Sequence, residues 1–187
     1  MIMKIQNKKM WLAVFILITL DQVIKIVINT NFLDKRFPIL PGLLSFEPMF
    51  NRHYSWLNSM LELGVSKWIH ISIVTIIIIL MYLFYKYLNE QFETNKIINI
   101  MYAFIFSGSM CSLIDKIFWN GSLDYIYVNG FFIFDLKDVY INIFIGLLAL
   151  SLFLKGKALK QFDDNNIVKD FTSYLLQNIL KCMRARF

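Results

Sequence analysis

Three aspartates in the second half of the chain, Asp124, Asp135 and Asp138, have the residue type and spacing for acid–base chemistry. Asp135 and Asp138 are three residues apart, which places both side chains on one face of a helix. Two carboxyl groups held close together outside bulk water do not both ionise easily, so they share a proton. The ionised group can then activate water while the protonated group donates to a carbonyl or a leaving amine, as in aspartic proteases. Helix capping is the alternative, and it would explain Asp135 or Asp138 alone.

Two further groups of charged residues lie near the ends of apolar segments, where ionisable side chains are costly and usually functional. Asp21 and Lys25 are spaced i, i+4, so they could also simply neutralise each other along one helix face. Asp115 and Lys116 could likewise form an ordinary pair at a membrane interface. We expect both groups to meet the three aspartates at a single depth, because all of them lie at one side of the bilayer.

Other kinds of active site have little support in this sequence. The chain has no G-x-S-x-G, no H-E-x-x-H and no cysteine with a histidine nearby. Its two cysteines and two well-separated histidines make a poor metal site, so we expect no metal.

Composition predicts that these residues are positioned by membrane-spanning helices. The chain is 187 residues long, 58% hydrophobic, and has a mean hydropathy of +0.57. The apolar residues gather in four blocks, 10–28, 65–88, 97–118 and 139–154, which approach the ~20 residues needed to cross a bilayer. The sequence therefore predicts an all-α membrane protein with four transmembrane helices. Polar residues at one face only, with no path across the bilayer, disfavour an ion or proton transporter.

Charge placement predicts the topology. With the N-terminus inside, twelve of the 19 lysine and arginine residues fall in inside segments and seven fall outside, which favours both termini in the cytoplasm. The net charge of +6 then reflects topology and attraction to membrane lipids rather than nucleic acid. The outside segment 30–64 contains apolar runs at 39–40 and 43–46 that suit short strands at the membrane surface. We divide the chain into a four-span domain, 1–155, and a cytoplasmic tail, 156–187.

The tail carries an apolar stripe with a four-residue repeat, which predicts an amphipathic helix on the inner membrane face, or alternatively one packed on a soluble partner. The residues of the stripe are Ile167, Phe171, Leu175, Ile179 and Met183.

Five motifs in order, from about residue 10 to 155, resemble those of the lipoprotein signal peptidase (signal peptidase II) family. The run from Asp21 to Lys25 matches D-Q-x-x-K, and the stretch from Pro38 to Asn51 is similar to the segment leading to N-x-G-A-A-F. The later motifs are similar to G-G-A-L-G-N-x-x-D-R at 107–116, G-x-V-V-D-F-I at 121–126, and F-N-x-A-D at 134–138.

The resemblance implies a four-helix membrane bundle with a small extracytoplasmic β-cradle in the bacterial cytoplasmic (inner) membrane, with its active site at the outer face. It implies an aspartic endopeptidase that removes signal peptides from diacylglyceryl-modified prolipoproteins without a cofactor. The catalytic aspartates map onto Asp124 and Asp138. Supporting or substrate-binding positions map onto Asp21, Lys25, Asn51, Ser112, Asp115, Lys116 and Asp135.

The chain departs from the family motifs at several of these positions. Ser112 replaces an asparagine, Lys116 an arginine and Asp135 an asparagine, while Lys137 replaces a small residue and can offset the added charge. Bulkier residues follow Asn51, where the family has Gly-Ala-Ala-Phe. These departures leave an alternative function open: a catalytically weak or inactive paralogue that binds lipoprotein precursors or a membrane partner.

Overall fold

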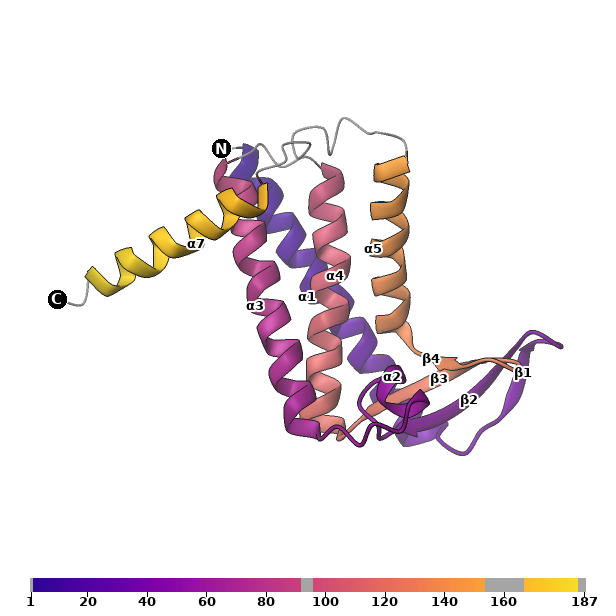
Figure 1. The fold of residues 1–187 in the computed structure, drawn as a ribbon. Coiled ribbons are helices and arrows are strands. Elements are labelled where there is room, and N and C mark those ends of the chain that lie inside the picture. Colours follow the sequence, from indigo (N-terminus) through magenta and orange to yellow (C-terminus); the bar gives the residue numbers. More distant parts are fainter. Residues whose placement is uncertain (1, 92–95, 154–166, 185–187) are drawn as a thin grey trace.

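A computed structural model describes residues 2–91, 96–153 and 167–184 of the chain. Four helices in this part are long and apolar enough to cross a membrane: Lys8–Asn31, Lys67–Gln91, Lys96–Trp119 and Leu136–Phe153. Each of the four predicted blocks overlaps one of them. The first, third and fourth helices begin earlier than the predicted blocks, and Lys137 and Asp138 belong to the first turn of the fourth helix. Figure 1 shows the four helices side by side.

The first long helix is α1 (Ile2–Asn31), followed by the hairpin β1 (Phe37–Leu40) and β2 (Leu44–Asn51) and the short α2 (Trp56–Met60). Next come α3 (Lys67–Gln91) and α4 (Lys96–Ile114), which continues into the π-helical turn η1 (Asp115–Trp119). The chain then forms β3 (Ser122–Val128), β4 (Ile133–Phe134), α5 (Leu136–Phe153) and α7 (Ile167–Arg184).

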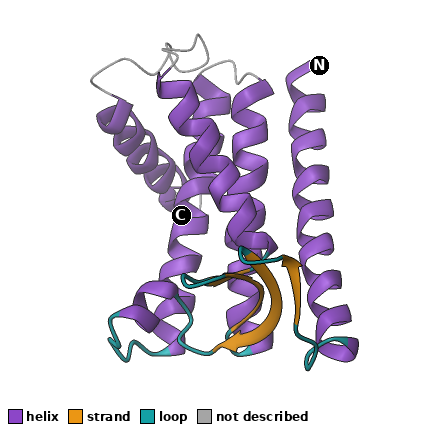
Figure 2. Ribbon diagram, turned by 90° about the vertical axis from the view of Figure 1, so that its right-hand side faces the viewer, coloured by secondary structure: helices purple, strands orange, loops and turns teal. Residues whose placement is uncertain are grey.

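The four strands form one antiparallel sheet in the order β1-β2-β3-β4. It covers one end of the long helices, as Figures 1 and 2 show. The two strands predicted in the first outside segment are present and extend further, since β2 continues to Asn51. β3 was not predicted. A small hydrophobic core of Ile28, Leu123 and Tyr125 joins the sheet to the end of α1.

The long helices expose apolar side chains outward, as expected of helices that face lipid tails. Leu12, Phe15 and Ile16 on α1 and Ile76 on α3 are all more than half exposed. α4 is the central helix and packs against α1, α3 and α5. The polar residues described below are instead buried between the helices and the sheet.

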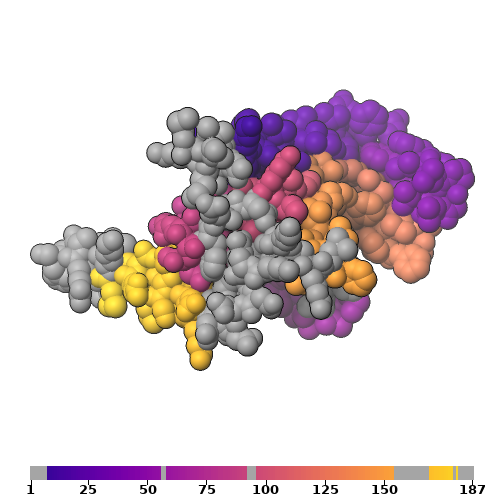
Figure 3. Space-filling view, turned by 90° about the horizontal axis from the view of Figure 1, so that it is seen from above, coloured from indigo at the N-terminus to yellow at the C-terminus, as the bar shows by residue number. Residues whose placement is uncertain are grey.

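The predicted tail stripe falls on α7. Phe171 and Tyr174 of α7 pack against the aromatic rings of Phe84 and Tyr87 on α3. Figure 3 shows α7 projecting to one side of the long helices, away from the sheet. Residues 154–166 lie outside the described part of the chain, as do the side chains of Ile167, Ile179 and Met183.

Gly108 allows α4 and the start of α5 to approach each other closely. A Cβ atom at this position would lie 2.7 Å from Cγ1 of Ile141 and 3.1 Å from the carbonyl oxygen of Lys137. Because Lys137 and Asp138 are in this first turn of α5, the contact sets how deeply both residues enter the molecule.

We predict that Gly108→Ala lowers the free energy of unfolding by about 1–3 kcal/mol, since the added methyl group forces α4 and α5 apart. Gly146→Ala on α5 is the matched control, because no atom lies within 4 Å of its added Cβ. Thermal unfolding of the purified variants in detergent would measure both. A Gly108 variant as stable as the Gly146 variant would contradict this account of the helix contact.

Candidate active site

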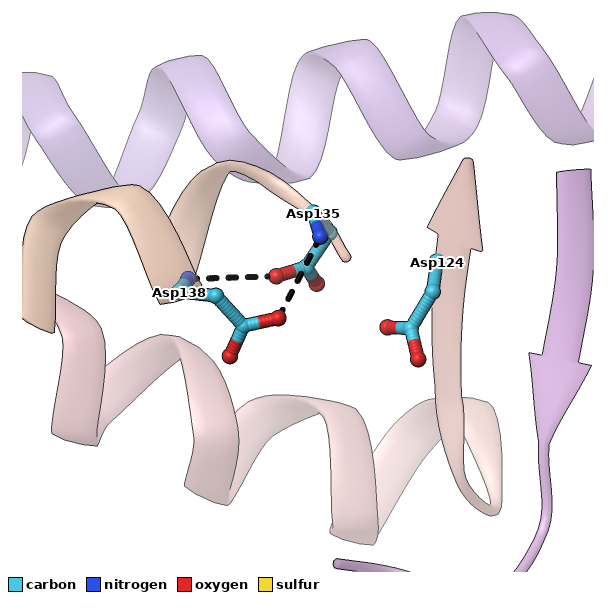
Figure 4. A group of neighbouring side chains, drawn as sticks. All are labelled: Asp124, Asp135 and Asp138. Carbon is cyan, nitrogen blue, oxygen red and sulfur yellow. Dashed lines mark hydrogen bonds between the residues drawn. The ribbon is translucent and has the colours of Figure 1, made fainter. Parts of the chain in front are cut away.

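Charged residues from four elements meet where the long helices reach the sheet. α1 provides two of them, η1 and β3 one each, and the segment that begins α5 three. We call this group the ionic cluster, and it comprises Asp21, Lys25, Asp115, Asp124, Asp135, Lys137 and Asp138. Figure 4 shows three of its carboxylates.

Lys25 is the inner cation of the ionic cluster, and its side chain is 0% exposed. Its Nζ lies 3.0 Å from Oδ2 of Asp21, 2.6 Å from Oδ2 of Asp115 and 2.7 Å from Oδ2 of Asp135. Asp21 and Lys25 do pair along α1, but Lys25 also binds two carboxylates from other elements. The pair therefore connects α1 to η1 and α5.

Lys137 is the second cation, and its side chain is 9% exposed. Its Nζ lies 2.5 Å from Oδ2 of Asp135, 3.4 Å from Oδ2 of Asp115 and 3.5 Å from Oδ1 of Asp124. The expected charge compensation of Asp135 by Lys137 is thus present as a direct ion pair.

Asp135 and Asp138 cap the start of α5 reciprocally. The backbone N–H of Asp138 donates to Oδ1 of Asp135, and the backbone N–H of Asp135 donates to Oδ2 of Asp138, both at 3.3 Å. Figure 4 shows Asp124 facing this pair from β3. One carboxylate oxygen from each of the three residues lies within 4.8 Å of the others. Capping therefore contributes to this arrangement without accounting for Asp124.

Asp124 and Asp135, which lie outside the membrane-spanning helices, differ in the direction of their pKa shifts. Burial raises the pKa of Asp124, and the opposing charge of Lys137 reduces this rise without cancelling it. Burial also acts to raise the pKa of Asp135, but Lys137 and Lys25 outweigh it and hold that pKa at about 2. Asp135 is therefore an ionised counter-ion, whereas Asp124 has the raised pKa that suits a proton-transfer group.

Asp138 borders an open pocket of about 510 Å³ with mostly apolar walls. Phe132 and Phe134 line it from the loop and strand before α5, and Ile141 and Asn142 line it from the next turn of α5. The pocket gives an apolar group access to one of the candidate catalytic carboxyls.

Three supporting residues expected from the sequence do not bind the carboxylates. Oδ1 of Asn51 accepts a hydrogen bond from the backbone N–H of His53 at 3.0 Å, so it stabilises the turn after β2. Nζ of Lys116 donates to Oγ of Ser112 at 2.7 Å. Among the described residues, no carboxylate oxygen lies within 4.0 Å of the Lys116 ammonium group.

The structure adds two polar residues that the sequence reasoning missed. Oγ of Ser122 lies 2.7 Å from Oδ1 of Asp124 and 2.6 Å from Nζ of Lys137. The amide of Gln22 donates to Oδ2 of Asp21 and accepts a hydrogen bond from the Trp119 indole N–H at 3.0 Å. Two signals were available: Ser122 is two residues from Asp124 in an aromatic and β-branched run, and Gln22 lies within the D-Q-x-x-K motif.

The carboxylates of Asp124, Asp135 and Asp138 have the spacing of a cation site. Lys137 already places its ammonium nitrogen against Asp135 and near Asp124. Because this side chain supplies the positive charge that a metal ion would bring, the residues present do not favour a metal ion at that position. The absence of a metal stays a prediction.

We predict that Lys25→Met destabilises the protein by about 3–5 kcal/mol, because three buried carboxylates lose their shared cation. Lys86→Met is the control, since Lys86 forms an ion pair with Glu90 in which both side chains are 47% exposed. This control should change stability by no more than about 1 kcal/mol. Denaturant or thermal unfolding in detergent would compare them, and equal losses would mean that Lys25 does not hold the ionic cluster together.

Comparisons with known proteins point to one family. The family model described as signal peptidase (SPase) II matches residues 13–154. A lipoprotein signal peptidase from Microcystis aeruginosa is 28% identical over 152 residues, covering 79% of this chain and 94% of its own length. A lipoprotein signal peptidase from Shouchella clausii is 26% identical over 153 residues, covering 79% and 94% respectively.

Two solved structures, both described as a bacterial membrane enzyme, have the same fold. Each superposes with a TM-score of 0.64, at 22% and 23% sequence identity. The first covers 84% of this chain and 93% of the solved chain, and the second 78% and 92%. Because the family match spans three-quarters of the sequence, including every member of the ionic cluster, the chain belongs to the signal peptidase II family of membrane peptidases.

Proposed function

We propose that this protein is an aspartic endopeptidase that removes signal peptides from diacylglyceryl-modified prolipoproteins, with Asp124 and Asp138 as its catalytic pair. The observation that carries the proposal is the placement of these two carboxyls face to face at the edge of the membrane helices, with oxygens within 4.8 Å. Family membership supports the peptidase activity, and the names of the relatives support the substrate class.

The geometry suits a water molecule held between the two carboxyls. A water that forms hydrogen bonds of ~2.8 Å to two oxygens can bridge a gap of this size. The ionised carboxyl takes a proton from this water as it attacks the scissile carbonyl. The protonated carboxyl donates its proton to the carbonyl oxygen, which gives a tetrahedral gem-diol. When this intermediate collapses, the carboxyl that took the water proton passes it to the leaving amine, and the other carboxyl recovers a proton from a gem-diol hydroxyl. The pair thereby returns to its starting state.

Substrate binding is supported by the apolar pocket beside Asp138. Its lining by Phe132, Phe134 and Ile141 suits the acyl chains of a lipid-modified cysteine, because burial of hydrocarbon against these side chains is favourable. An acyl group bound there would hold the neighbouring peptide bond next to the catalytic pair.

The alternative, a catalytically weak or inactive paralogue that binds precursors, is less well supported. Both candidate catalytic aspartates are retained, and the carboxylate added at Asp135 is neutralised by the lysine at 137. The bulky residues after Asn51 are the strongest argument for that alternative. Of these, Arg52 and His53 are exposed, on a turn beside the sheet.

Replacing either catalytic carboxyl by its amide tests the proposal. Asp124→Asn or Asp138→Asn should lower the rate of precursor cleavage by at least about a hundredfold, because the amide keeps the shape but cannot exchange the proton. The assay is a gel shift with purified protein and a diacylglyceryl-modified precursor. Asp34→Asn, in an exposed loop, is the control and should retain full activity.

Two results would contradict the proposal. Wild-type protein that is folded and does not cleave any lipid-modified precursor would favour the binding paralogue. Amide variants that cleave at the wild-type rate would remove Asp124 and Asp138 from the reaction.

We also propose that the sheet and ionic cluster lie at the outer face of the bacterial cytoplasmic membrane, with both termini inside. The excess of lysine and arginine in segments at the opposite end supports this orientation. It places the catalytic pair on the side where exported precursors emerge.

Single introduced cysteines test the orientation in a Cys182→Ser background, where the remaining Cys111 is buried. Leu43→Cys, at the β1–β2 turn, should react with a membrane-impermeant thiol reagent in intact cells. Glu90→Cys, at the other end of α3, should react only after the membrane is permeabilised. The reverse pattern would overturn the orientation.

A further inference from the structure

Lys137 contacts one of the two candidate catalytic carboxyls and not the other. Its Nζ lies 3.5 Å from Oδ1 of Asp124. Asp138 has no comparable partner: among the described residues, no lysine or arginine nitrogen lies within 4.0 Å of its carboxylate. Lys137 therefore makes a direct ion pair with Asp124, whereas its charge acts on Asp138 from beyond 4.0 Å.

Hydrogen-bond donors distinguish them in the same way. An ammonium group has no acceptor, so the 2.6 Å contact between Lys137 and Ser122 requires that the serine oxygen accepts. The single hydroxyl proton of Ser122 must then point to a carboxylate, and Oδ1 of Asp124 is the nearest at 2.7 Å. Asp124 Oδ1 thus accepts a hydrogen bond, which favours the ionised carboxylate.

The surroundings of Asp138 favour the protonated form instead. Within the described part of the chain its carboxylate accepts one hydrogen bond, at 3.3 Å from the backbone N–H of Asp135, and the residue borders an apolar pocket. A carboxyl beside apolar walls and an ionised neighbour keeps its proton more readily than one that receives a hydroxyl donor and an ammonium group.

We propose that Lys137 is a positioning residue that keeps Asp124 ionised, so that Asp124 is the base that activates water and Asp138 is the acid. This inference rests on the peptidase function proposed above. In the reaction, Asp124 takes one proton from water and Asp138 gives one to the scissile carbonyl, so charge and protons balance.

Asp135 is the residue that fixes Lys137 in this position. Its Oδ2 is 2.5 Å from the Lys137 nitrogen and 2.7 Å from the Lys25 nitrogen, and its side chain is fully buried. The changes at 135 and 137, relative to the F-N-x-A-D pattern, thus form one charge-neutral pair. Asp135 alone would add a negative charge beside the catalytic carboxyls, and Lys137 alone would lack its anchor.

Several charged groups act on Asp124 from the elements around it. β3 contributes no other charge near it, so its titration depends on α1, η1 and the start of α5. Lys137 and Lys25 lower its pKa, whereas Asp135 raises it. The remaining titratable groups of the ionic cluster are Asp21, Asp115 and Asp138.

The test is the pH dependence of kcat/KM in Lys137→Met. Activity requires ionised Asp124, so it falls as the pH drops through the pKa of Asp124. Loss of the nearby positive charge raises that pKa, and the acidic limb should move up by about one pH unit. The double variant Asp135→Asn with Lys137→Met removes one charge of each sign, so its limb should lie closer to wild type.

A matched control and a second readout separate this role from simple structural damage. Lys67 lies at the same end of the helices, and its nitrogen is near the carbonyl oxygen of Ile117. Lys67→Met therefore removes a positive charge outside the ionic cluster and should leave the acidic limb unchanged. Carbon-13 NMR of aspartate-labelled protein in micelles would follow the Asp124 carboxyl directly, assigned by its loss in Asp124→Asn. Its titration should move up in Lys137→Met whether or not the protein cleaves a precursor.

The outcomes distinguish the two proposals. An upward shift in the NMR titration supports Lys137 as the residue that keeps Asp124 ionised, even if cleavage fails and the peptidase proposal falls. An unchanged or lowered titration of Asp124 in Lys137→Met overturns the inference, even if cleavage by the wild type is normal. Rescue of the wild-type limb by Lys137→Arg would further support a role for charge.

Discussion

A lysine ammonium group buried at the end of a membrane helix needs anionic partners, because its desolvation is costly without them. Lys25 meets this requirement with carboxylates from α1, η1 and the start of α5. Once these groups are joined, the ends of three elements have fixed relative positions. The sheet can then pack on α1 through Leu123 and Tyr125, which carries Asp124 to the same place.

The same constraint explains why the site lies at one edge of the membrane rather than in its centre. The middle parts of the long helices expose aliphatic and aromatic side chains, and charged side chains there would face hydrocarbon. At the end near the sheet, the Ser122 hydroxyl group on β3 and the backbone N–H groups of Asp135 and Asp138 donate hydrogen bonds to carboxylates. Gly108 adds the close contact of α4 with α5 that brings Asp138 opposite Asp124.

The Asp135–Lys137 pair shows how a site can change residues and keep its charge balance. An added carboxylate beside two others would make the site harder to ionise, and the adjacent ammonium group removes that penalty. A pair of opposite charges is nevertheless more polar and more directional than an amide and a small side chain. The direct contact of Lys137 is with Asp124 and not with Asp138, and so it bears on which proposed catalytic group carries the proton.

The sequence by itself determined the four apolar spans and predicted the charged residues of the ionic cluster, because apolar block length and intramembrane charge are local properties of the chain. It also predicted the family, since ordered motifs need no three-dimensional information. Only the tertiary structure decided that Lys25 bridges three carboxylates, that Ser122 links Lys137 to Asp124, and that Asn51 and Lys116 bind elsewhere. These partners lie far apart along the chain, 90 residues for Lys25 and Asp115 and further still for Lys25 and Asp135, so their meeting depends on how helices and sheet pack. β3 was missed for a related reason: its strand conformation is stabilised by pairing with β2, which is more than 70 residues earlier in the sequence.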